Sequence, residues 1–172
     1  MLRHNSLKIF LAFVFLLLGA ASWAGEDAAR ITVFGLSFDR PAGWEVTETQ
    51  DYGPSKYISV EKKGYNSSGL VIITFTDKNS KPKEYLEVHQ KSFLNQKIMK
   101  ELVFSEAKEE YYGKHKGIAS SYTFQIASVK HAGKIYVFNT NGMTVSVVHQ
   151  EAIEDHAANR PGFETIMKSL SF

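Results

Sequence analysis

Two histidines and two acidic residues near the end of the chain come closest to a metal or acid–base cluster. They are His149 and Glu151, in the segment His149-Gln-Glu151, followed by Asp155 and His156. Imidazole nitrogens and carboxylate oxygens together suit zinc or manganese. Because side chains alternate along a strand, His149 would continue the inward face of Val147 and lie at its rim.

The same residues also have a structural interpretation. Glu151 and Asp155 are four residues apart, a spacing that would place both on one face of a helix. A strand that ends near His149, followed by a helix whose acidic first turn complements its dipole, accounts for the pattern. We therefore predict no metal and no cofactor, and these four residues are the candidates that a metal-binding experiment would test.

No other arrangement of catalytic residues stands out. The sequence has neither a G-x-S-x-G nor an H-E-x-x-H segment, and the spacing of its serines and histidines does not indicate a triad. It has no cysteine, which excludes thiol chemistry, thiolate metal sites and disulfides. We expect a protein that is not an enzyme.

Tyrosines are the candidates for binding a partner. Aromatic residues make up 13% of the chain, and several tyrosines fall in or near expected loops and strand ends. Tyrosine is favoured at interfaces because it joins a large apolar ring to a polar tip. The candidates are Tyr52, Tyr65, Tyr111 and Tyr112. Partial burial within the fold would explain the same positions, so both interpretations stay open.

The first 24 residues have the parts of a secretory signal peptide. Arg3 and Lys8 belong to a basic start, residues 9–18 are an unbroken apolar run, and small residues flank the position before Ala24. A transmembrane anchor is the alternative, but it needs about 20 apolar residues. We predict cleavage after Ala24, and a single exported domain over residues 25–172, in the bacterial periplasm or secreted.

Removal of this segment changes the charge of the chain. The sequence has 20 Lys and Arg and 18 Asp and Glu. Because Arg3 and Lys8 leave with the signal, 18 basic residues remain against 18 acidic ones. A neutral protein attracts nucleic acid weakly, so we expect no nucleic-acid partner. The lack of cysteine also excludes a lipoprotein anchor.

The exported part begins with strand patterns. Apolar residues occupy odd positions before Gly35 and even positions after it, which predicts a tight turn or a bulge there. Residues 70–76 (LVIITFT) are apolar at both alternating sets of positions. Such a strand is covered on both faces, so we expect helices above and below the sheet.

Two helices are expected. Ser80, Pro82 and Glu84 suit the start of a helix that should run to about Leu102. Its expected buried positions include Leu86, Phe93, Ile98, Met99 and Leu102. A second helix closes the chain, with Pro161 near its start and one apolar stripe. The stripe consists of Phe163, Ile166, Met167 and Leu170.

Antiparallel strands are expected between the two helices. Residues 104–112 should form a polar strand that leads to a turn at Gly113, and residues 118–127 alternate cleanly. A turn is expected at 131–133, and Asn141-Gly142 is typical of a type I′ hairpin turn. The resulting fold class is α+β, with an antiparallel β-sheet sandwiched between helices.

The order of elements and two short motifs resemble a known superfamily. The motifs are Phe38-Asp-Arg-Pro41-Ala-Gly43-Trp44, after the first strands, and the closing segment 163–172. With the long helix and the meander, they resemble the PsbP-like superfamily over nearly all of residues 30–172. That superfamily includes photosystem extrinsic proteins, DcrB-type periplasmic proteins and a Ran-binding nuclear import factor. The resemblance implies a PsbP-like α/β/α fold.

The resemblance also implies a function. Members of that superfamily mostly act as non-enzymatic binding or assembly factors, so it implies an exported module with a protein partner in the envelope or in a membrane complex. Photosystem members have been linked with manganese, but we find no matching ligand motif. The alternative function is a carrier of a small apolar ligand or lipid, held between sheet and helix.

Overall fold

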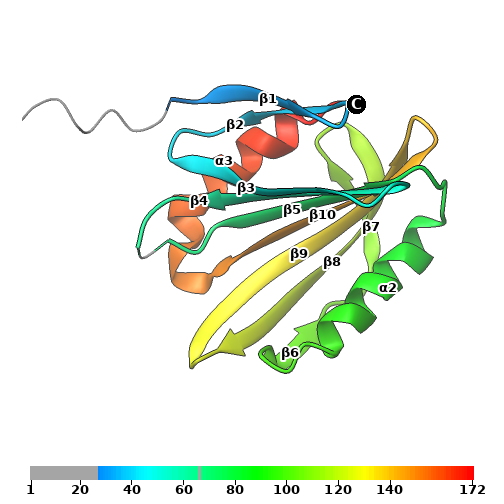
Figure 1. Cartoon of the computed structure of the whole chain (residues 1–172). Helices are drawn as coiled ribbons and strands as arrows, with labels where there is room; N and C mark the ends of the chain where they lie inside the picture. Colours follow the sequence, from blue (N-terminus) through cyan, green and yellow to red (C-terminus); the bar gives the residue numbers. More distant parts are fainter. Residues whose placement is uncertain (1–26, 66) are drawn as a thin grey trace, which may run out of the picture.

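The computed structural model describes residues 27–65 and 67–172. The expected signal peptide, residues 1–24, lies outside the described residues. Within the described ranges the chain forms an eight-stranded antiparallel sheet, a separate two-stranded hairpin and two α-helices. In Figure 1, α3 lies beside the hairpin at the upper left, and α2 lies apart from them at the lower right.

The large sheet has the order β3-β4-β5-β10-β9-β8, with β6 and β7 both paired to β8. Its strands are β3 (Trp44–Asp51), β4 (Ser55–Lys62), β5 (Leu70–Thr76), β6 (Lys100–Phe104), β7 (Lys108–Tyr112), β8 (His115–Ile126), β9 (Val129–Thr140) and β10 (Met143–Ala152). The other elements are the hairpin strands β1 (Ala29–Val33) and β2 (Leu36–Arg40), the helices α2 (Pro82–Leu94) and α3 (His156–Ser169), and the 3-10 turn η1 (Ile153–Asp155).

The hairpin β1–β2 contains the tight turn expected at Gly35. Phe34 and Gly35 connect its strands with φ values of 52° and 81°, the left-handed conformation of a type I′ turn. The phase change in the apolar pattern follows from this turn, because Val33 pairs directly with Leu36 across it.

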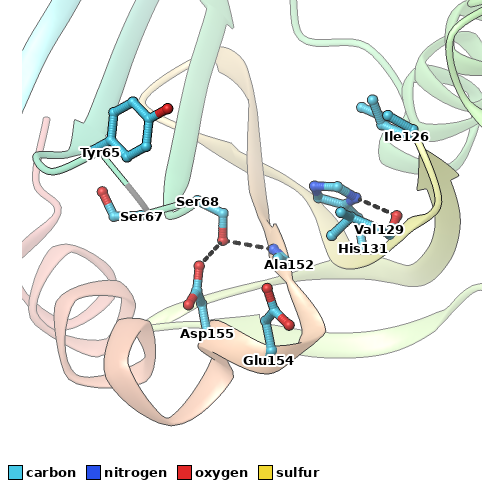
Figure 2. Close-up of a pocket in the computed structure, with 10 residues that line it drawn as sticks. Tyr65, Ser67, Ser68, Ile126, Val129, His131, Ala152, Glu154 and Asp155 are labelled. Atoms are coloured by element: carbon cyan, nitrogen blue, oxygen red, sulfur yellow. Dashed lines mark hydrogen bonds between the residues drawn. The ribbon is translucent and has the colours of Figure 1, made fainter.

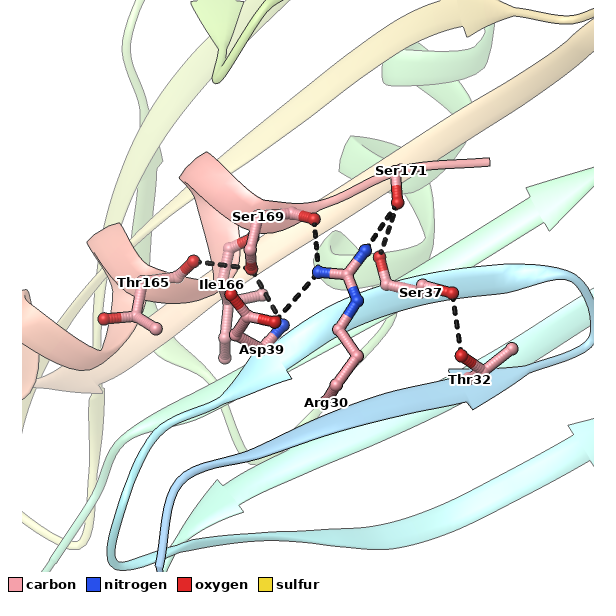
Figure 3. A network of polar contacts seen from close by, with 8 residues as sticks. All are labelled: Arg30, Thr32, Ser37, Asp39, Thr165, Ile166, Ser169 and Ser171. Carbon is pink, nitrogen blue, oxygen red and sulfur yellow. Dashed lines mark hydrogen bonds and ion pairs between the residues drawn. The ribbon is translucent and has the colours of Figure 1, made fainter.

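Arg30 joins this hairpin to the end of α3 (Figure 3). Its guanidinium donates to Asp39 Oδ1 at 2.9 Å, to the Ser169 carbonyl at 3.0 Å and to Ser171 Oγ at 2.8 Å. Two backbone hydrogen bonds of 2.9 Å link Ser37 and Ser171 beside it. We call these five residues the C-terminal clamp, because they hold the last turn of α3 against β2.

One face of the sheet packs against α3 and the hairpin. Trp44 is buried there and meets the Phe163 ring edge to face, with 5.4 Å between centroids. A Cβ atom at Gly69 or Gly162 would lie 2.6 Å from the indole, so glycine is needed at both positions. Gly43 lies in the turn just before Trp44, with a φ of +74° that favours glycine.

The other face of the sheet packs against α2, which contacts β8 and β9. The buried residues of this side are Leu86, Tyr122, Phe124, Ile135, Val137 and Val148. The central strand β5 serves both sides, since Val71 and Ile73 belong to the core under α3 while Ile72 packs against the α2 side. The fold is therefore α+β with an antiparallel sheet. The expected arrangement, a sheet with helices alone on both faces, differs from the structure: α2 covers one face, and the hairpin β1–β2 covers the other together with α3.

The prediction that helix α2 runs to about Leu102 is wrong. Helix α2 ends at Leu94, and the chain then turns so that Lys100 begins strand β6. Ile98, expected to be buried, is 60% exposed. Met99 and Leu102 still contact the core of the α2 side, but from the turn and from the strand. Their apolar spacing was compatible with a helix, and only the turn after Leu94 distinguishes the two structures.

The start of α2 also differs from expectation. The N-cap residue is Lys81, without a side-chain cap, and Pro82 and Glu84 occupy the first turn as predicted. Ser80 does not cap the helix; its amide donates instead to Thr144 Oγ1 at 2.8 Å. At the other helix, α3 begins at His156, so Pro161 lies inside it.

The turn predicted at 131–133 is wrong, and the Asn141-Gly142 turn is confirmed, with φ values of 49° and 77°. The chain reverses instead at Ala127 and Ser128, between β8 and β9. Gly133 lies within β9, where a Cβ atom would be 2.3 Å from Cζ of Tyr122. This glycine makes room for a ring and does not form a turn.

Candidate functional site

The structure places the four metal candidates in three separate contacts. Glu151 Oε1 is 2.6 Å from Nδ1 of His156, Asp155 accepts a 2.6 Å hydrogen bond from Ser68, and His149 lies in the core. Over the described residues, no group of three or more histidine and acidic side chains is placed to hold a metal ion. The prediction that Glu151 and Asp155 share a helix face is wrong, because β10 continues to Ala152.

His149 is a neutral core residue and does not lie at a rim. Its ring stacks on Phe163 at a centroid distance of 4.6 Å, and its Nε2 shares a 3.0 Å hydrogen bond with the Tyr112 hydroxyl. Burial, reinforced by the nearby Lys134 ammonium, lowers the pKa of His149 to about 3. Burial likewise raises the pKa of Tyr112 above its ordinary value, so both groups stay uncharged at neutral pH.

A small cavity lies beside His149, between β9, β10 and α3. Its volume is about 260 Å³. Its lining includes Lys134, Tyr136, His149, Glu151, His156 and Phe163. Glu151 is only 5% exposed, and its Oε2 has no hydrogen-bond partner. We call this space the inner cavity; Tyr136, His149 and Phe163 give it mostly aromatic walls.

The four tyrosine candidates divide into one buried and three exposed residues. Tyr112 is buried in the core, so its assignment to a partner-binding surface is corrected. Tyr52, Tyr65 and Tyr111 are exposed. Tyr52 follows the edge strand β3 and Tyr111 lies on β7, whereas Tyr65 lines an open groove.

This groove lies between Tyr65, Ser67 and Ser68 on one side and the turn from β8 to β9 on the other (Figure 2). It has a volume of about 550 Å³. Figure 2 shows Tyr65 on one side of the opening and Ile126 and Val129 on the other. Ser68 fixes the loop, because its hydroxyl donates to Asp155 and accepts a 2.8 Å hydrogen bond from the Ala152 amide. The groove therefore has one side anchored to η1 and one formed by a hairpin tip.

A second depression, of about 370 Å³, lies on the other side of the same hairpin tip. Its lining includes Val103, Phe124, His131 and Ile153, and His131 lines both depressions. Val103, Ile153 and Val129 are 63%, 47% and 41% exposed. We call Tyr65, Val103, Val129 and Ile153, with His131 between them, the tip surface.

The turn at the centre of the tip surface has an unusual backbone. Ala127 and Ser128 have φ values of 47° and 72°, a conformation that glycine and asparagine adopt more readily. Such residues cost about 1 kcal/mol or more each and are enriched at binding sites. Sequence reasoning missed the tip surface because its members come from four separate segments. The exposed Tyr65 was the one signal available.

Comparisons with solved structures identify the fold. The cyanobacterial PsbP protein CyanoP from Synechocystis has a TM-score of 0.55 at 15% identity, covering 90% of this chain and 98% of its own. LpqN of Mycobacterium tuberculosis, described as involved in cell envelope biogenesis, has a TM-score of 0.52 at 11% identity, covering 86% of each chain. A Bacteroides thetaiotaomicron protein has a TM-score of 0.53 at 13% identity, covering 79% of this chain and 44% of its own.

No family model matches the chain, and no curated protein matches it in sequence. At identities of 11–15% the structural likenesses carry the fold alone. The fold is PsbP-like, as the resemblance of the motifs implied. None of the helices formed by the described residues has the length and apolar character that crossing a bilayer requires.

Proposed function

We propose that this protein is an exported module that binds a protein partner in the cell envelope and catalyses no reaction. The tip surface is the site where the partner binds. Three observations support the proposal: the signal-peptide pattern of residues 1–24, the PsbP-like fold, and the structural likeness to LpqN, a protein involved in cell envelope biogenesis.

The gathering of exposed apolar side chains around one turn carries the proposal. Single exposed apolar residues are ordinary on protein surfaces, but several that line two neighbouring open depressions are typical of an interaction site. Val129 projects at the hairpin tip, with Val103 and Ile153 on one side and Tyr65 on the other.

The rim of the tip surface is polar, as in most interfaces. Glu101 and Lys130 line the smaller depression, and Glu154 and Asp155 line the larger groove. An apolar centre surrounded by such groups excludes water from the contact while the rim sets orientation. The combination fits a protein partner better than a lipid surface, because acidic groups are repelled by anionic headgroups.

Photo-crosslinking in intact cells tests this assignment. A photoreactive amino acid at Val129 is expected to trap one dominant envelope protein. The matched control is Val88, an aliphatic residue on the outer face of α2 that is 61% exposed and far from the tip in sequence. A product obtained equally from both positions, or no product from Val129 under any growth condition, would contradict the proposal.

A carrier of a small ligand is the second candidate function, and the inner cavity favours it. Ligand pockets usually have volumes of about 300–1,000 Å³. At about 260 Å³ the inner cavity suits a small molecule better than a lipid. Native mass spectrometry of protein purified from the envelope tests this candidate, since a carrier retains a small molecule of defined mass.

A further inference from the structure

We propose that the turn between α2 and β6 attaches the protein to the anionic surface of a phospholipid membrane. The exposed side chains of Leu94 and Ile98 enter the headgroup region, and neighbouring lysine ammonium groups pair with lipid phosphates. We call these five residues the basic turn; its lysines are Lys91, Lys97 and Lys100. The inference does not depend on the protein partner proposed above, because the basic turn shares no residue with the tip surface.

Hydrogen bonds and inward-facing side chains fix this turn. The Gln96 amide donates to the Phe93 carbonyl at 2.9 Å, and the Met99 amide donates to the Gln96 carbonyl at 3.0 Å. Phe93 and Met99 pack against the core of the α2 side. The second hydrogen bond closes a β-turn whose two central residues are Lys97 and Ile98. The fold therefore holds these two residues on the outside of the turn.

Leu94 and Ile98 are exposed at positions that are ordinarily polar. Their side chains are 63% and 60% exposed, although β-turns favour Gly, Asn, Asp and Ser. Exposed apolar side chains that gather on one element mark contacts with proteins or membranes. Insertion of such side chains among lipid headgroups removes their apolar area from water, which favours binding.

The charge around these side chains favours an anionic surface as the partner. Residues 88–100 contain three lysines and no acidic residue, whereas residues 25–172 carry as many basic as acidic residues. All three lysines are exposed, and the ion pairs of the described residues involve other basic groups. Each lysine near an anionic membrane strengthens binding about fivefold.

The acidic residues nearest in sequence do not cancel this charge. Glu87 lies one turn before Lys91 on α2, and Glu101 follows Lys100 on β6. Glu101 Oε2 already accepts a 2.7 Å hydrogen bond from Gln125 Nε2 of the neighbouring strand β8. The basic turn thus differs from the rim of the tip surface, which is mainly acidic. A lipid surface fits the basic turn for the same reason that it does not fit the tip.

Vesicle co-sedimentation tests the proposal on protein purified from the periplasm of expressing cells. We expect binding to vesicles of phosphatidylglycerol and phosphatidylethanolamine, and binding to phosphatidylcholine vesicles that is weaker by about tenfold or more. Ile98→Asp should weaken binding to the anionic vesicles by about tenfold, because the headgroups repel a carboxylate.

Val88→Asp is the matched control for Ile98→Asp. Val88 is 61% exposed on the same helix, but six residues before Leu94 it lies about 120° around the helix axis from that side chain. The variant has the same change in net charge. In physiological salt it should keep its affinity within about twofold, because charges away from the contact are screened.

Lysine variants separate the basic turn from the overall charge of the protein. Lys91→Gln, Lys97→Gln and Lys100→Gln together should abolish binding to the anionic vesicles. The matched control removes three other exposed lysines, and its changes are Lys83→Gln, Lys108→Gln and Lys114→Gln. This control should still bind, although its net charge is the same.

Tryptophan fluorescence locates the contact. The emission of Ile98→Trp should shift to shorter wavelength when anionic vesicles are added, because the indole leaves water. Val88→Trp should show no shift. Trp44 is 3% exposed in the core, so it contributes the same background to both variants.

Three results would overturn the proposal: equal binding to both kinds of vesicle, unchanged binding in Ile98→Asp, or an equal loss in the two lysine variants. Absence of binding by the wild-type protein would also overturn it and would make an acidic protein the occupant of the turn. The substituted side chains are exposed, so the variants should fold, and circular dichroism checks this. A failed vesicle experiment leaves the crosslinking result at Val129 untouched, so the two proposals fail separately.

Discussion

The two ends of helix α3 lie in different surroundings. At its C-terminal end, the C-terminal clamp joins the chain to the β1–β2 hairpin by hydrogen bonds, of which Arg30 alone makes three. At its N-terminal end, η1 leads into the tip surface, where Ile153 and Val129 remain exposed. One end is closed by contacts within the fold, and the other presents exposed apolar side chains. The contrast teaches that the polar contacts that stabilise the fold and the exposed apolar side chains that we propose bind a partner lie at opposite ends of one helix.

The largest expected effect on stability is at Trp44, which is buried in the core under α3. Trp44→Ala should lower the free energy of unfolding by about 3–5 kcal/mol, because the indole fills the space against Gly162 and Phe163. Urea denaturation measures this change. Val88→Ala, at an exposed position, is the control and should stay within about 0.5 kcal/mol of the wild type. A similar loss in both variants would remove the distinction between closed and open regions.

The second effect is on stability in acid. It arises at His149, which lies on β10 and stacks on Phe163 in the middle of α3. Its pKa is about 3 in the folded protein against about 6.5 when unfolded, so only the unfolded state gains a proton as pH falls below 6.5. The stability that the low pKa of His149 contributes is therefore fully present above pH 6.5 and is lost progressively as the pH falls toward 3. Between pH 7 and pH 5 the loss is about 2 kcal/mol.

Denaturation of His149→Gln at the same two pH values checks this prediction. The variant is less stable at pH 7, because it loses the stack on Phe163, but its acid-dependent loss should be smaller by about 2 kcal/mol. An unchanged pH dependence would show that His149 is not the group responsible.

A smaller effect is expected at the clamp itself. Arg30→Ala should destabilise the protein by about 1 kcal/mol, since the lost hydrogen bonds are charge-assisted but half exposed to solvent. Arg160→Ala removes an exposed pair with Glu164 within α3 and is the control, with an expected cost of about 0.3 kcal/mol. Thermal denaturation compares the two, and an equal cost would show that the clamp is only another surface ion pair.

The smallest effect on stability, and the largest on binding, is expected at the tip surface. Val129→Asp and Ile153→Asp should each change the unfolding free energy by less than about 0.5 kcal/mol, because both side chains already contact solvent. The same substitutions should abolish capture of the envelope partner by a photoreactive residue at Tyr65. A stable variant that still captures the partner would place the interface elsewhere.

Local patterns in the sequence determined most of the elements. The doubly apolar segment 70–76 became the central strand β5, the apolar stripe after Pro161 became α3, and Asn141-Gly142 became a type I′ turn. The turn at Gly35 followed in the same way from a change of phase. These predictions depend on neighbouring residues alone, so the sequence contains all the information they need.

Local patterns gave wrong predictions where the same spacing of residues is compatible with two different structures. Met99 and Leu102 contact the core from a turn and a strand as effectively as they would from a helix. Gly133 was taken for a turn residue because glycine permits one, but the Tyr122 ring is what requires it. Tyr112 falls at an expected strand end, where it is a candidate for a partner-binding surface, and its burial depends on His149, 37 positions away on another strand.

Both candidate sites were decided by the tertiary structure. The inner cavity needs β9, β10 and α3 together, and the tip surface collects Tyr65, Val103, Val129 and Ile153 from separate segments. The sequence by itself determined the exclusion of thiol chemistry and the main elements, because these depend on composition and short-range order. Where the exposed apolar groups meet depends on strand pairing across the whole chain, and no local pattern contains that information.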